Sequence, residues 1–276
     1  MAKRALCVGI NQFAHLPMAS WLYGCVNDAN DMAGMLRKRG FAAQSITVLT
    51  DTQATKAAVM GALTEMVGAA KPGDHLVFSF SSHGTQVPDT DGDEPDGSDE
   101  AFACHDIAQA GNQWDTNTVI VDDELRTLLA TLPKGVLFEA FLDTCHSGSG
   151  LRGDDLLAGR RPRYLPPPTA RGLRAVESAP KKVQMVSLVK TLPAASRPVL
   201  YAGCQPDQTS ADATFDNRSN GAFTYYFLKA VSAGAARSRK EIHAEITKAL
   251  RAGDFTQRPT LEGPPKSKTS AVGDPW

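Results

Sequence analysis

Two apolar segments of strand length end abruptly in side chains suited to chemistry. The first, "SFSSHGTQ", stops at His83 and Gly84, and the second, "FLDTCHSGSG", stops at Cys145. A thiol activated by a nearby imidazole is the working pair of a cysteine hydrolase, with backbone N–H groups free to hold an oxyanion. Cys145 is the expected nucleophile, and the amides of Gly84 and Cys145 are the expected oxyanion donors. A single cysteine or histidine at a strand end is more often structural, so the fold has to bring the two together.

The rest of the chain alternates strand-like runs with helical patterns. The strand-like runs are "RALCVGI" (4–10), "SITVLT" (45–50), "HLVFSFSS" (75–82), "VLFEAFLDT" (136–144) and "RPVLYAGC" (197–204). Helical patterns cover roughly 27–39, 53–70, 122–132, 220–233 and 238–252. Continuous apolar strands joined by helical crossovers predict an α/β fold, a mostly parallel sheet with helices on both faces. Functional groups of such a sheet gather beyond the carboxyl ends of its strands, where His83 and Cys145 are expected.

Alternation along the two strands adds two residues to this edge of the sheet. Asp143 is expected to point the same way as Cys145, and Ser81 the same way as His83. A carboxylate beside a thiol raises the thiol pKa and disfavours the thiolate. Asp143 therefore either binds a cationic group of the substrate, to which a desolvated carboxylate is suited, or has an ordinary capping or salt-bridge role. The spacing alone leaves both interpretations open.

Composition narrows the class of protein. The chain has 276 residues, 42% of them hydrophobic, and a formal net charge of -1, which suits a substantial α/β core and argues against general polyanion binding. Its five cysteines include no C-x-x-C pair, which fits neither a disulfide framework nor a structural zinc site and favours a reducing compartment. The sequence shows no signal peptide and no stretch of membrane-spanning length. We therefore expect a cytoplasmic monomer with no specific nucleic-acid partner and no membrane partner.

Seven segments spread almost from end to end resemble a known family. They are "RALCVGIN", "YGCVNDANDM", "FSSHGTQVPDTDGDEPDGSDEAF", "VDDEL", "LDTCHSGS", "AGCQPDQTSAD" and "GAFTYYFL". Together they resemble the metacaspases, caspase-like cysteine peptidases of bacteria, protists, fungi and plants, in their prokaryotic or type I form. The resemblance implies a caspase-like fold and a cysteine endopeptidase that cleaves protein or peptide substrates after Arg or Lys. His83 and Cys145 match the catalytic dyad of the family.

The resemblance also implies an acidic primary pocket for the basic side chain of the substrate. The matching positions are Asp28 and Asp143, with Cys25 and Ser81 beside them. This agrees with the substrate-binding interpretation of Asp143. The chain has Ser81-Ser82 where the family often has Ser-Gly before the catalytic His-Gly, a harmless change if Ser82 points away from the site.

The family also suggests how the chain is divided. One caspase-like peptidase domain is expected over 1–276, with a large-subunit-like part at about 1–158, a basic Pro-rich loop at about 159–195 and a small-subunit-like part at about 196–276. No prodomain precedes the first strand, so we expect no recruitment function of the kind that such an extension carries.

The basic segment suggests self-processing. Between Arg152 and Lys190 there are nine Lys or Arg and three Asp or Glu, and the proline-rich, non-periodic sequence predicts a long exposed loop. Such a loop suits a contact with nucleic acid or membrane. In an arginine-specific peptidase it also supplies cleavable bonds, and we predict self-cleavage between about Arg160 and Lys190, abolished by Cys145→Ala.

Acidic residues are concentrated elsewhere. Between Thr85 and Glu124 there are twelve Asp or Glu and no Lys or Arg. The spacing imitates an EF-hand loop, but Glu94 stands at the glycine position and no helices flank it, so that motif is rejected. The run of acids at 122–124 also suits a helix N-terminus. The resemblance implies an activating, non-catalytic Ca²⁺ near the active site, and the matching positions are Asp99, Asp122, Asp123 and Asp154, the last ambiguous with Asp155.

Two other functions stay open. A non-catalytic interaction protein could keep the caspase fold as a scaffold, although this chain retains both His83 and Cys145. Another arginine-specific peptidase branch of the same clan would share the dyad but not the acidic segment. Covalent labelling of Cys145 by an arginyl chloromethylketone separates the enzyme from the scaffold.

Overall fold

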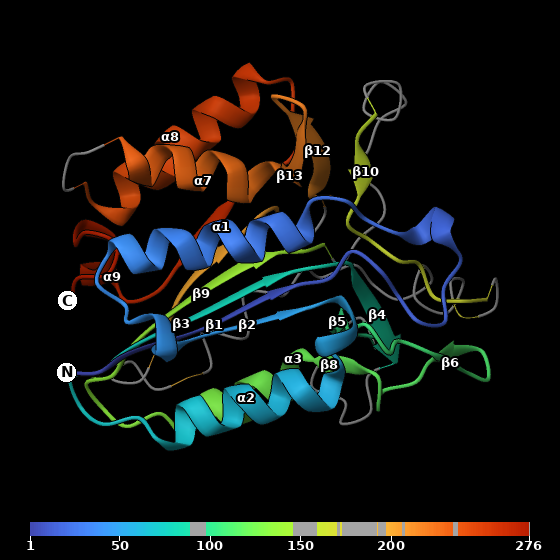
Figure 1. The fold of residues 1–276 in the computed structure, drawn as a ribbon, viewed down its shortest axis with the longest axis horizontal. Coiled ribbons are helices and arrows are strands. Elements are labelled where there is room, and N and C mark those ends of the chain that lie inside the picture. The colour runs from blue at the N-terminus through green and yellow to red at the C-terminus, as the bar shows by residue number, and fades with distance from the viewer. Residues whose placement is uncertain are drawn as a thin grey trace.

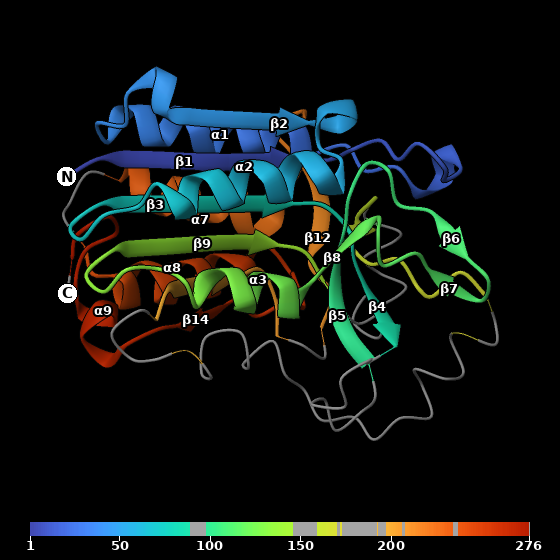
Figure 2. The same ribbon diagram turned by 90° about the horizontal axis from the view of Figure 1, so that it is seen from below.

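A six-stranded sheet runs through the middle of the molecule (Figures 1 and 2). The computed structural model describes residues 1–88, 98–145, 159–169, 172, 192, 197–205, 208–233 and 237–275. The strand order is β14-β11-β9-β3-β1-β2. The strands are β1 Lys3–Gly9, β2 Ile46–Thr50, β3 His75–Ser81, β9 Leu137–Asp143, β11 Val199–Ala202 and β14 Thr260–Glu262. Neighbours are parallel except β14, which is antiparallel to β11, and this confirms the mostly parallel α/β sheet.

Helices cover both faces of the sheet (Figure 1). On one face lie α1 (Cys25–Lys38), α7 (Ala222–Ser232) and α8 (Arg239–Ala252), and on the other lie α2 (Lys56–Gly68) and α3 (Asp122–Leu129). A separate cluster of buried apolar side chains fills the space between the sheet and the helices on each face. Every residue of β3 and of β9 is buried, which is why these strands lack polar alternation. The short α9 (Pro265–Thr269) follows β14.

Small antiparallel sheets stand at the carboxyl end of the central strands (Figure 2). One contains β4 (Gly84–Pro88), β5 (Ser98–Ala103) and β8 (Val119–Val121). A second contains β10 (Arg161–Pro162), β12 (Ala211–Phe215) and β13 (Arg218–Gly221), and a third pairs β6 (Gln109–Ala110) with β7 (Gln113–Trp114). Short 3₁₀ turns lie at Met18–Ser20, Ala43–Ser45 and Asp51–Gln53. These small sheets surround the edge where the sequence places the chemistry.

One structural expectation is wrong for the part that can be tested. The basic Pro-rich segment was expected to be an exposed loop, but in its described part Arg163 is 0% exposed and Leu165 is 6% exposed. The reason is that carboxylates from distant parts of the chain surround the Arg163 guanidinium and hold the segment down. The remainder of the segment, apart from the residues named above, lies outside the described residues, as does the acidic run 89–97.

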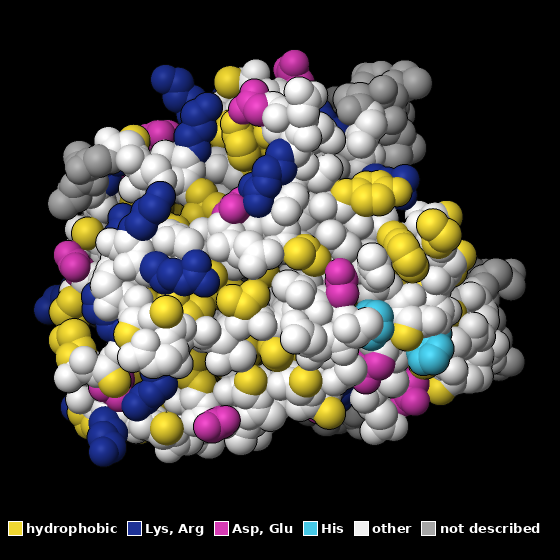
Figure 3. Space-filling view, in the orientation of Figure 1, with side chains coloured by type: hydrophobic (Ala, Val, Ile, Leu, Met, Phe, Trp, Pro, Cys, Tyr) yellow, Lys and Arg dark blue, Asp and Glu magenta, His cyan; other side chains and the backbone are white. Residues whose placement is uncertain are grey.

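The face shown in Figure 3 carries Lys and Arg side chains interspersed with Asp and Glu. On this face the described residues of neither charge form one continuous surface. No helix in the described ranges combines the length and the apolar composition needed to cross a bilayer.

Candidate active site

The two strands that carry the expected catalytic pair are neighbours. β3 runs parallel to β9, with Ser81 opposite Asp143. Both strands end at the same edge of the sheet. His83 lies two residues after the end of β3 and Cys145 two residues after the end of β9, and they are 3% and 0% exposed. The strand pairing on which the sequence argument depends is therefore confirmed.

A backbone carbonyl orients the imidazole of His83. Nε2 lies 2.7 Å from the carbonyl oxygen of Ser20, which accepts only, so Nε2 carries the proton. The pKa of His83 is lowered to about 4, mainly by burial; the hydrogen bond to Ser20 opposes this shift, and the charges of Arg163 and Arg161 contribute to it. The ring is thus neutral near pH 7, and its Nδ1 finds no hydrogen-bond partner among the described residues. A neutral imidazole with a free Nδ1 lone pair is in the state that a general base needs.

The sulfur of Cys145 lies among donors. The backbone N–H of Ser210 donates to Sγ, and Sγ of Cys204 lies 3.6 Å away. A hydrogen bond with Cys145, together with burial, raises the pKa of Cys204 well above its ordinary value, so Cys204 stays protonated and donates toward Cys145. All five cysteines are free thiols.

The guanidinium of Arg163 fills an acidic pocket beside the thiol. Nη2 lies 2.7 Å from Oδ2 of Asp28, and Nη1 lies 3.3 Å from Oδ2 of Asp143. A third carboxylate, Asp212, lies 3.9 Å from Nη2. Nη1 also donates to the backbone oxygen of Asp143 at 3.0 Å. The structure therefore brings the two predicted aspartates together around one buried cation, and adds a third that the sequence argument missed.

Each carboxylate is fixed by further donors. Asp28 accepts from Asn220 Nδ2 at 2.9 Å and from the N–H of Gly221 at 3.0 Å. The donors to the other two are Ser210 Oγ and the N–H and Oγ1 of Thr224 for Asp143, and the N–H groups of Tyr23 and Gly24 for Asp212. These bonds fix the positions of the carboxylate oxygens around the guanidinium.

Three buried carboxyl groups around one guanidinium cannot all ionise freely. Burial raises the pKa of Asp28 to about 7, the neighbouring Asp143 adds to the shift, and Arg163 opposes it. Burial likewise raises the pKa of Asp212. The charges of these groups in turn raise the pKa of Arg163, although its burial opposes the shift. The pocket therefore holds a guanidinium that stays charged among carboxyl groups whose ionisation burial disfavours.

The carbonyl group of Arg163 lies in the expected oxyanion position. Its oxygen accepts from the N–H of Gly84 at 2.9 Å and from the N–H of Cys145 at 3.2 Å. Its own N–H donates to the carbonyl oxygen of Ser210 at 3.0 Å. The backbone carbonyl of Arg163 is thus held by two amides next to the thiol, while the side chain of the same residue occupies the acidic pocket.

Cys25 and Ser81 lie beside the acidic pocket, as the sequence predicts. Cys25 begins α1, the helix that carries Asp28, and is fully buried. Burial raises the pKa of its thiol, and among the nearby charges Arg163 opposes this shift while Asp212 and Asp28 add to it. Ser81 ends β3 opposite Asp143, and its hydroxyl has no hydrogen-bond partner among the described residues.

The predicted calcium ligands are gathered only in part. Asp99 lies on β5 and Asp122 begins α3, and each is 4% exposed. The β5–β8 register pairs Ala101, two residues after Asp99, with Val121, the residue before α3. Asp123 follows and pairs with Arg126. Asp154 lies outside the described residues. Within the described part of the chain, no group of three or more His, Cys, Asp or Glu is arranged to hold a metal ion. The helix N-terminus interpretation of 122–124 is confirmed, since Glu124 accepts from the N–H of Val121.

Several site residues were missed by the sequence argument. They are Ser20, Ser210, Asp212, Asn220, Gly221 and Thr224. Five of them lie within or next to "AGCQPDQTSAD" and "GAFTYYFL", segments that were recognised only as similar to the family. Gly221 is required by close packing, because a Cβ there would overlap Asp143 and Arg163. Ser20 contributes only its backbone carbonyl, which no side-chain pattern reveals.

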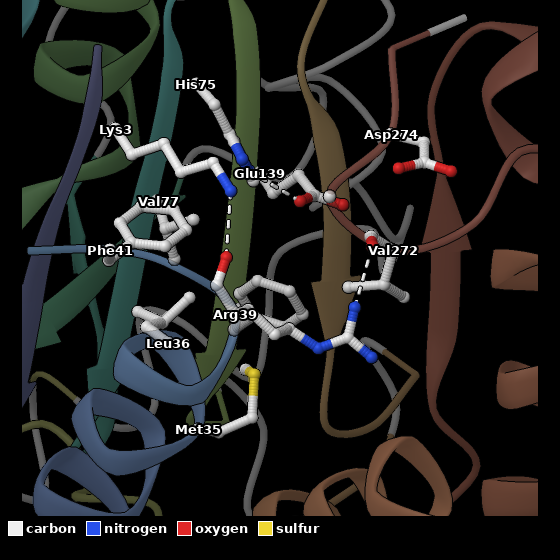
Figure 4. Close-up of a pocket in the computed structure, with 12 residues that line it drawn as sticks. Lys3, Met35, Leu36, Arg39, Phe41, His75, Val77, Glu139, Val272 and Asp274 are labelled. Carbon is white, nitrogen blue, oxygen red and sulfur yellow. Dashed lines mark hydrogen bonds and ion pairs between the residues drawn. The ribbon is translucent and has the colours of Figure 1, made fainter. Parts of the chain in front are cut away.

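A pocket lies at the opposite end of the sheet from His83 and Cys145. This pocket of about 190 Å³ is bordered by Lys3, Arg39, His75 and Glu139 (Figure 4). Its charged groups are engaged with one another or with backbone oxygens: His75 with Glu139 at 2.8 Å, and Lys3 with the carbonyl of Arg39 at 2.8 Å. The catalytic candidates therefore lie elsewhere, at the carboxyl ends of the strands.

Comparison with solved structures supports the class of fold. The crystal structure of a Geobacter sulfurreducens protein superposes with a TM-score of 0.71 and 29% sequence identity, covering 100% of both chains. Caspase-1 from Spodoptera frugiperda superposes with a TM-score of 0.54 over 95% of this chain and 86% of that one, at 12% identity. The fold is thus that of a caspase-like domain.

Sequence comparison gives the family. Residues 3–153 match the family described as metacaspase, peptidase C14 domain, and the chain belongs to this family. It is 32% identical to Metacaspase-1 of Coccidioides immitis, covering 94% of this chain and 61% of that one. It is also 32% identical to Metacaspase-1A of Aspergillus niger, covering 94% of this chain and 69% of that one. The chain therefore spans about three fifths of the first of these relatives.

Proposed function

We propose that this chain is a cysteine endopeptidase that hydrolyses peptide bonds after Arg or Lys. The observation that carries the proposal is Arg163: its side chain is clamped by Asp28 and Asp143 while its carbonyl oxygen accepts from the amides of Gly84 and Cys145. One residue thus makes both the specificity contact and the oxyanion contact. The ammonium group of Lys is also a cation that such a pocket would accept, although without the two-pronged geometry of Arg.

The reaction proceeds through an acyl-enzyme. Nδ1 of His83 takes the thiol proton, Sγ of Cys145 attacks the carbonyl carbon, and the amides of Gly84 and Cys145 stabilise the negative oxygen. His83 then gives the proton to the leaving amine, and the carbon–nitrogen bond breaks. Water, deprotonated by the same imidazole, hydrolyses the thioester and regenerates the thiol. The carbonyl of Ser20 takes the place of a third catalytic side chain by fixing the ring.

Two regulatory properties belong to the same proposal. Calcium would be held at the β5–α3 corner by Asp99, Asp122 and Asp123, completed by Asp154 from outside the described residues. The carboxylate oxygens suit Ca²⁺, and the burial of Asp99 and Asp122 favours a nearby cation. The ion would neutralise charge there and would take no part in the chemistry.

The second regulatory property is self-cleavage of the chain within the basic segment. The enzyme is proposed to act as a cytoplasmic monomer on protein substrates.

The test compares labelling and cleavage in matched variants. We expect an arginyl chloromethylketone to alkylate Cys145, and arginyl peptides, but not aspartyl peptides, to be cleaved. Asp28→Asn should lower kcat/KM at least about 100-fold, because it removes the partner of a buried charge. Asn30→Ala on the same helix is the control and should change kcat/KM less than about twofold, because its side chain is exposed.

Three outcomes would contradict the proposal. Absence of any labelling with and without calcium is what a non-catalytic scaffold predicts. A preference for Asp before the cleaved bond would exclude the acidic pocket as the specificity site. Equal losses in Asp28→Asn and Asn30→Ala would make the effect one of helix stability.

A further inference from the structure

A stretch of this chain crosses its own active site in the manner of a substrate. β10 pairs antiparallel with β12, which places Arg161 opposite Asp212 and brings the backbone N–H of Arg163 to the carbonyl of Ser210. On the other side of Arg163, the N–H of Leu165 donates to the carbonyl of Gly84 at 2.9 Å. The backbone is therefore held on both sides of the Arg163–Tyr164 peptide bond, with β10 alongside β12 (Figure 1).

The side chains after this bond are also docked. Leu165 is 6% exposed, and its carbonyl accepts from Oγ1 of Thr85 at 2.7 Å. The hydroxyl of Tyr164 lies 3.4 Å from Oε1 of Gln86. Tyr164 and Leu165 follow the bond, so their contacts engage the part of a substrate that leaves as the amine product.

Two further arginines occupy sites outside the acidic pocket. The guanidinium of Arg161 lies 4.7 Å from the centre of the Tyr23 ring and donates to the carbonyl of Ala19 at 3.1 Å. The guanidinium of Arg160 lies 3.9 Å from the centre of the Phe255 ring and donates to the carbonyls of Asp254 and Gly253 at 2.7 and 2.8 Å. Aromatic faces and carbonyl oxygens together favour cations.

We infer that the Arg163–Tyr164 bond is the self-cleavage site of this chain, and that Tyr23 and Phe255 mark two accessory subsites for basic side chains. The inference rests on the proposed peptidase function. Sγ of Cys145 forms a thioester with the Arg163 carbonyl carbon, the bond to the Tyr164 nitrogen breaks, and His83 supplies the proton to that nitrogen. Water then gives a free carboxylate on Arg163 and returns the thiol. The preferred external substrate is a multibasic segment with arginine before the cleaved bond and at the third and fourth positions.

The first experiment identifies the new N-terminus by mass spectrometry. The intact protein should yield a fragment that begins at Tyr164, with a rate constant unchanged over a wide range of protein concentration, because the segment already occupies its own site. Arg163→Gln should slow formation of this fragment at least about 100-fold. Arg163→Lys should retain cleavage before Tyr164, and Arg171→Gln, in the same basic stretch, is the matched control that should leave it unchanged.

The outcomes separate this inference from the proposed function. Cleavage of arginyl peptides without any fragment beginning at Tyr164 overturns the inference and leaves the proposed function standing. A Tyr164 fragment that persists in Arg163→Gln also overturns it. Absence of both peptide cleavage and self-cleavage overturns both. Because Arg163→Gln leaves carboxylates without their buried partner, its folding is verified by its own cleavage of arginyl peptides, in which the peptide refills the pocket.

The second experiment tests the accessory subsites with peptides. Replacing arginine by alanine at the third or fourth position before the cleaved bond should lower kcat/KM about threefold each, the size of an exposed cation–π contact. Tyr23→Ala should abolish the preference at the third position only, while Tyr23→Phe, which keeps the ring, should retain it. Phe255→Leu should abolish the preference at the fourth position only. Equal kcat/KM values of the wild type for the arginine and alanine peptides would show that neither subsite exists.

Discussion

At the residue scale, the burial of His83 couples stability to pH. Burial lowers the pKa of His83 to about 4, whereas histidine in an unfolded chain titrates near 6.5, so the unfolded state binds more protons between these values. The stability associated with a neutral His83 is therefore complete above about pH 6.5 and is lost as pH falls toward 4. A shift of this size corresponds to about 3 kcal/mol across the window.

The measurement is urea unfolding from pH 4 to 7 in a Cys145→Ala background, which prevents self-cleavage. His83→Gln in the same background should lose less stability than its parent as pH falls, by about 3 kcal/mol. Parallel pH profiles for the two proteins would show that His83 is not held neutral by burial. Carboxyl groups titrate equally in both, so only the difference between the profiles is interpreted.

The individual residues also show what a sequence pattern can predict. His83, Cys145 and Gly84 stand directly after apolar strands, and strand alternation adds Asp143, so elementary geometry was enough to assemble them. Asp212 was not found, because it reaches the pocket by the pairing of β12 with β10, a two-residue strand. The burial of Arg163 was not found either, since its partner Asp28 lies 135 positions away and local composition predicted an exposed loop.

At the element scale, the start of α3 is the place where calcium binding can be tested. α3 begins with Asp122, Asp123 and Glu124, immediately after β8, and β8 pairs with β5, which carries Asp99. If Ca²⁺ binds there, activity should rise with free calcium and vanish in excess chelator. The double variant Asp122→Ala with Asp123→Ala should raise the half-maximal calcium concentration about tenfold or more.

An exposed carboxylate supplies the control for this experiment. Glu65 lies on the outer side of α2, and Glu65→Ala should leave the calcium response unchanged. The calcium midpoint is the diagnostic quantity, because removing acids from the first turn of α3 also weakens the helix itself. Full activity in chelator, or the same midpoint in the double variant, would rule out this corner as the calcium site.

The large elements were predictable and the small ones were not. The five strand-like runs correspond to β1, β2, β3, β9 and β11, and the five helical patterns to α1, α2, α3, α7 and α8, with ends displaced by a few residues. Long apolar runs predict buried strands, and periodic apolar patterns predict helices, without any information on tertiary pairing. Short strands without a continuous apolar run, such as β10 and β12, are set by tertiary pairing, so their sequences contain little that distinguishes them from loops.

At the scale of the whole molecule, a buried ionic network ties the sheet to the last part of the chain. Glu139 on β9 accepts from Nε2 of His75 and from Nε of Arg239, each at 2.8 Å. Burial disfavours this carboxylate, but the hydrogen bond from His75 and the charge of Arg239 outweigh burial and lower the pKa of Glu139. Arg239 also donates to the carbonyls of Ser267 and Asp274 at 3.0 and 2.9 Å, so one side chain joins β9, α8 and α9.

Breaking this network should destabilise the fold without altering the chemistry. Arg239→Met leaves the Glu139 charge buried with less compensation and should lower the free energy of unfolding by about 3–5 kcal/mol, measured by urea unfolding in the Cys145→Ala background. Arg237→Met is the matched control: its partner Glu245 is exposed, so the expected loss is at most about 1 kcal/mol. Combining Glu139→Leu with Arg239→Met should recover part of the loss, because the uncompensated charge is gone, and the double-mutant cycle gives the coupling between the two side chains. The same substitutions are also made in the protein that keeps Cys145. There, kcat/KM per folded molecule should stay unchanged, since the network lies at the opposite end of the sheet from the thiol.

A fall in kcat/KM, or equal losses of stability for Arg239→Met and Arg237→Met, would contradict this separation of stability from catalysis.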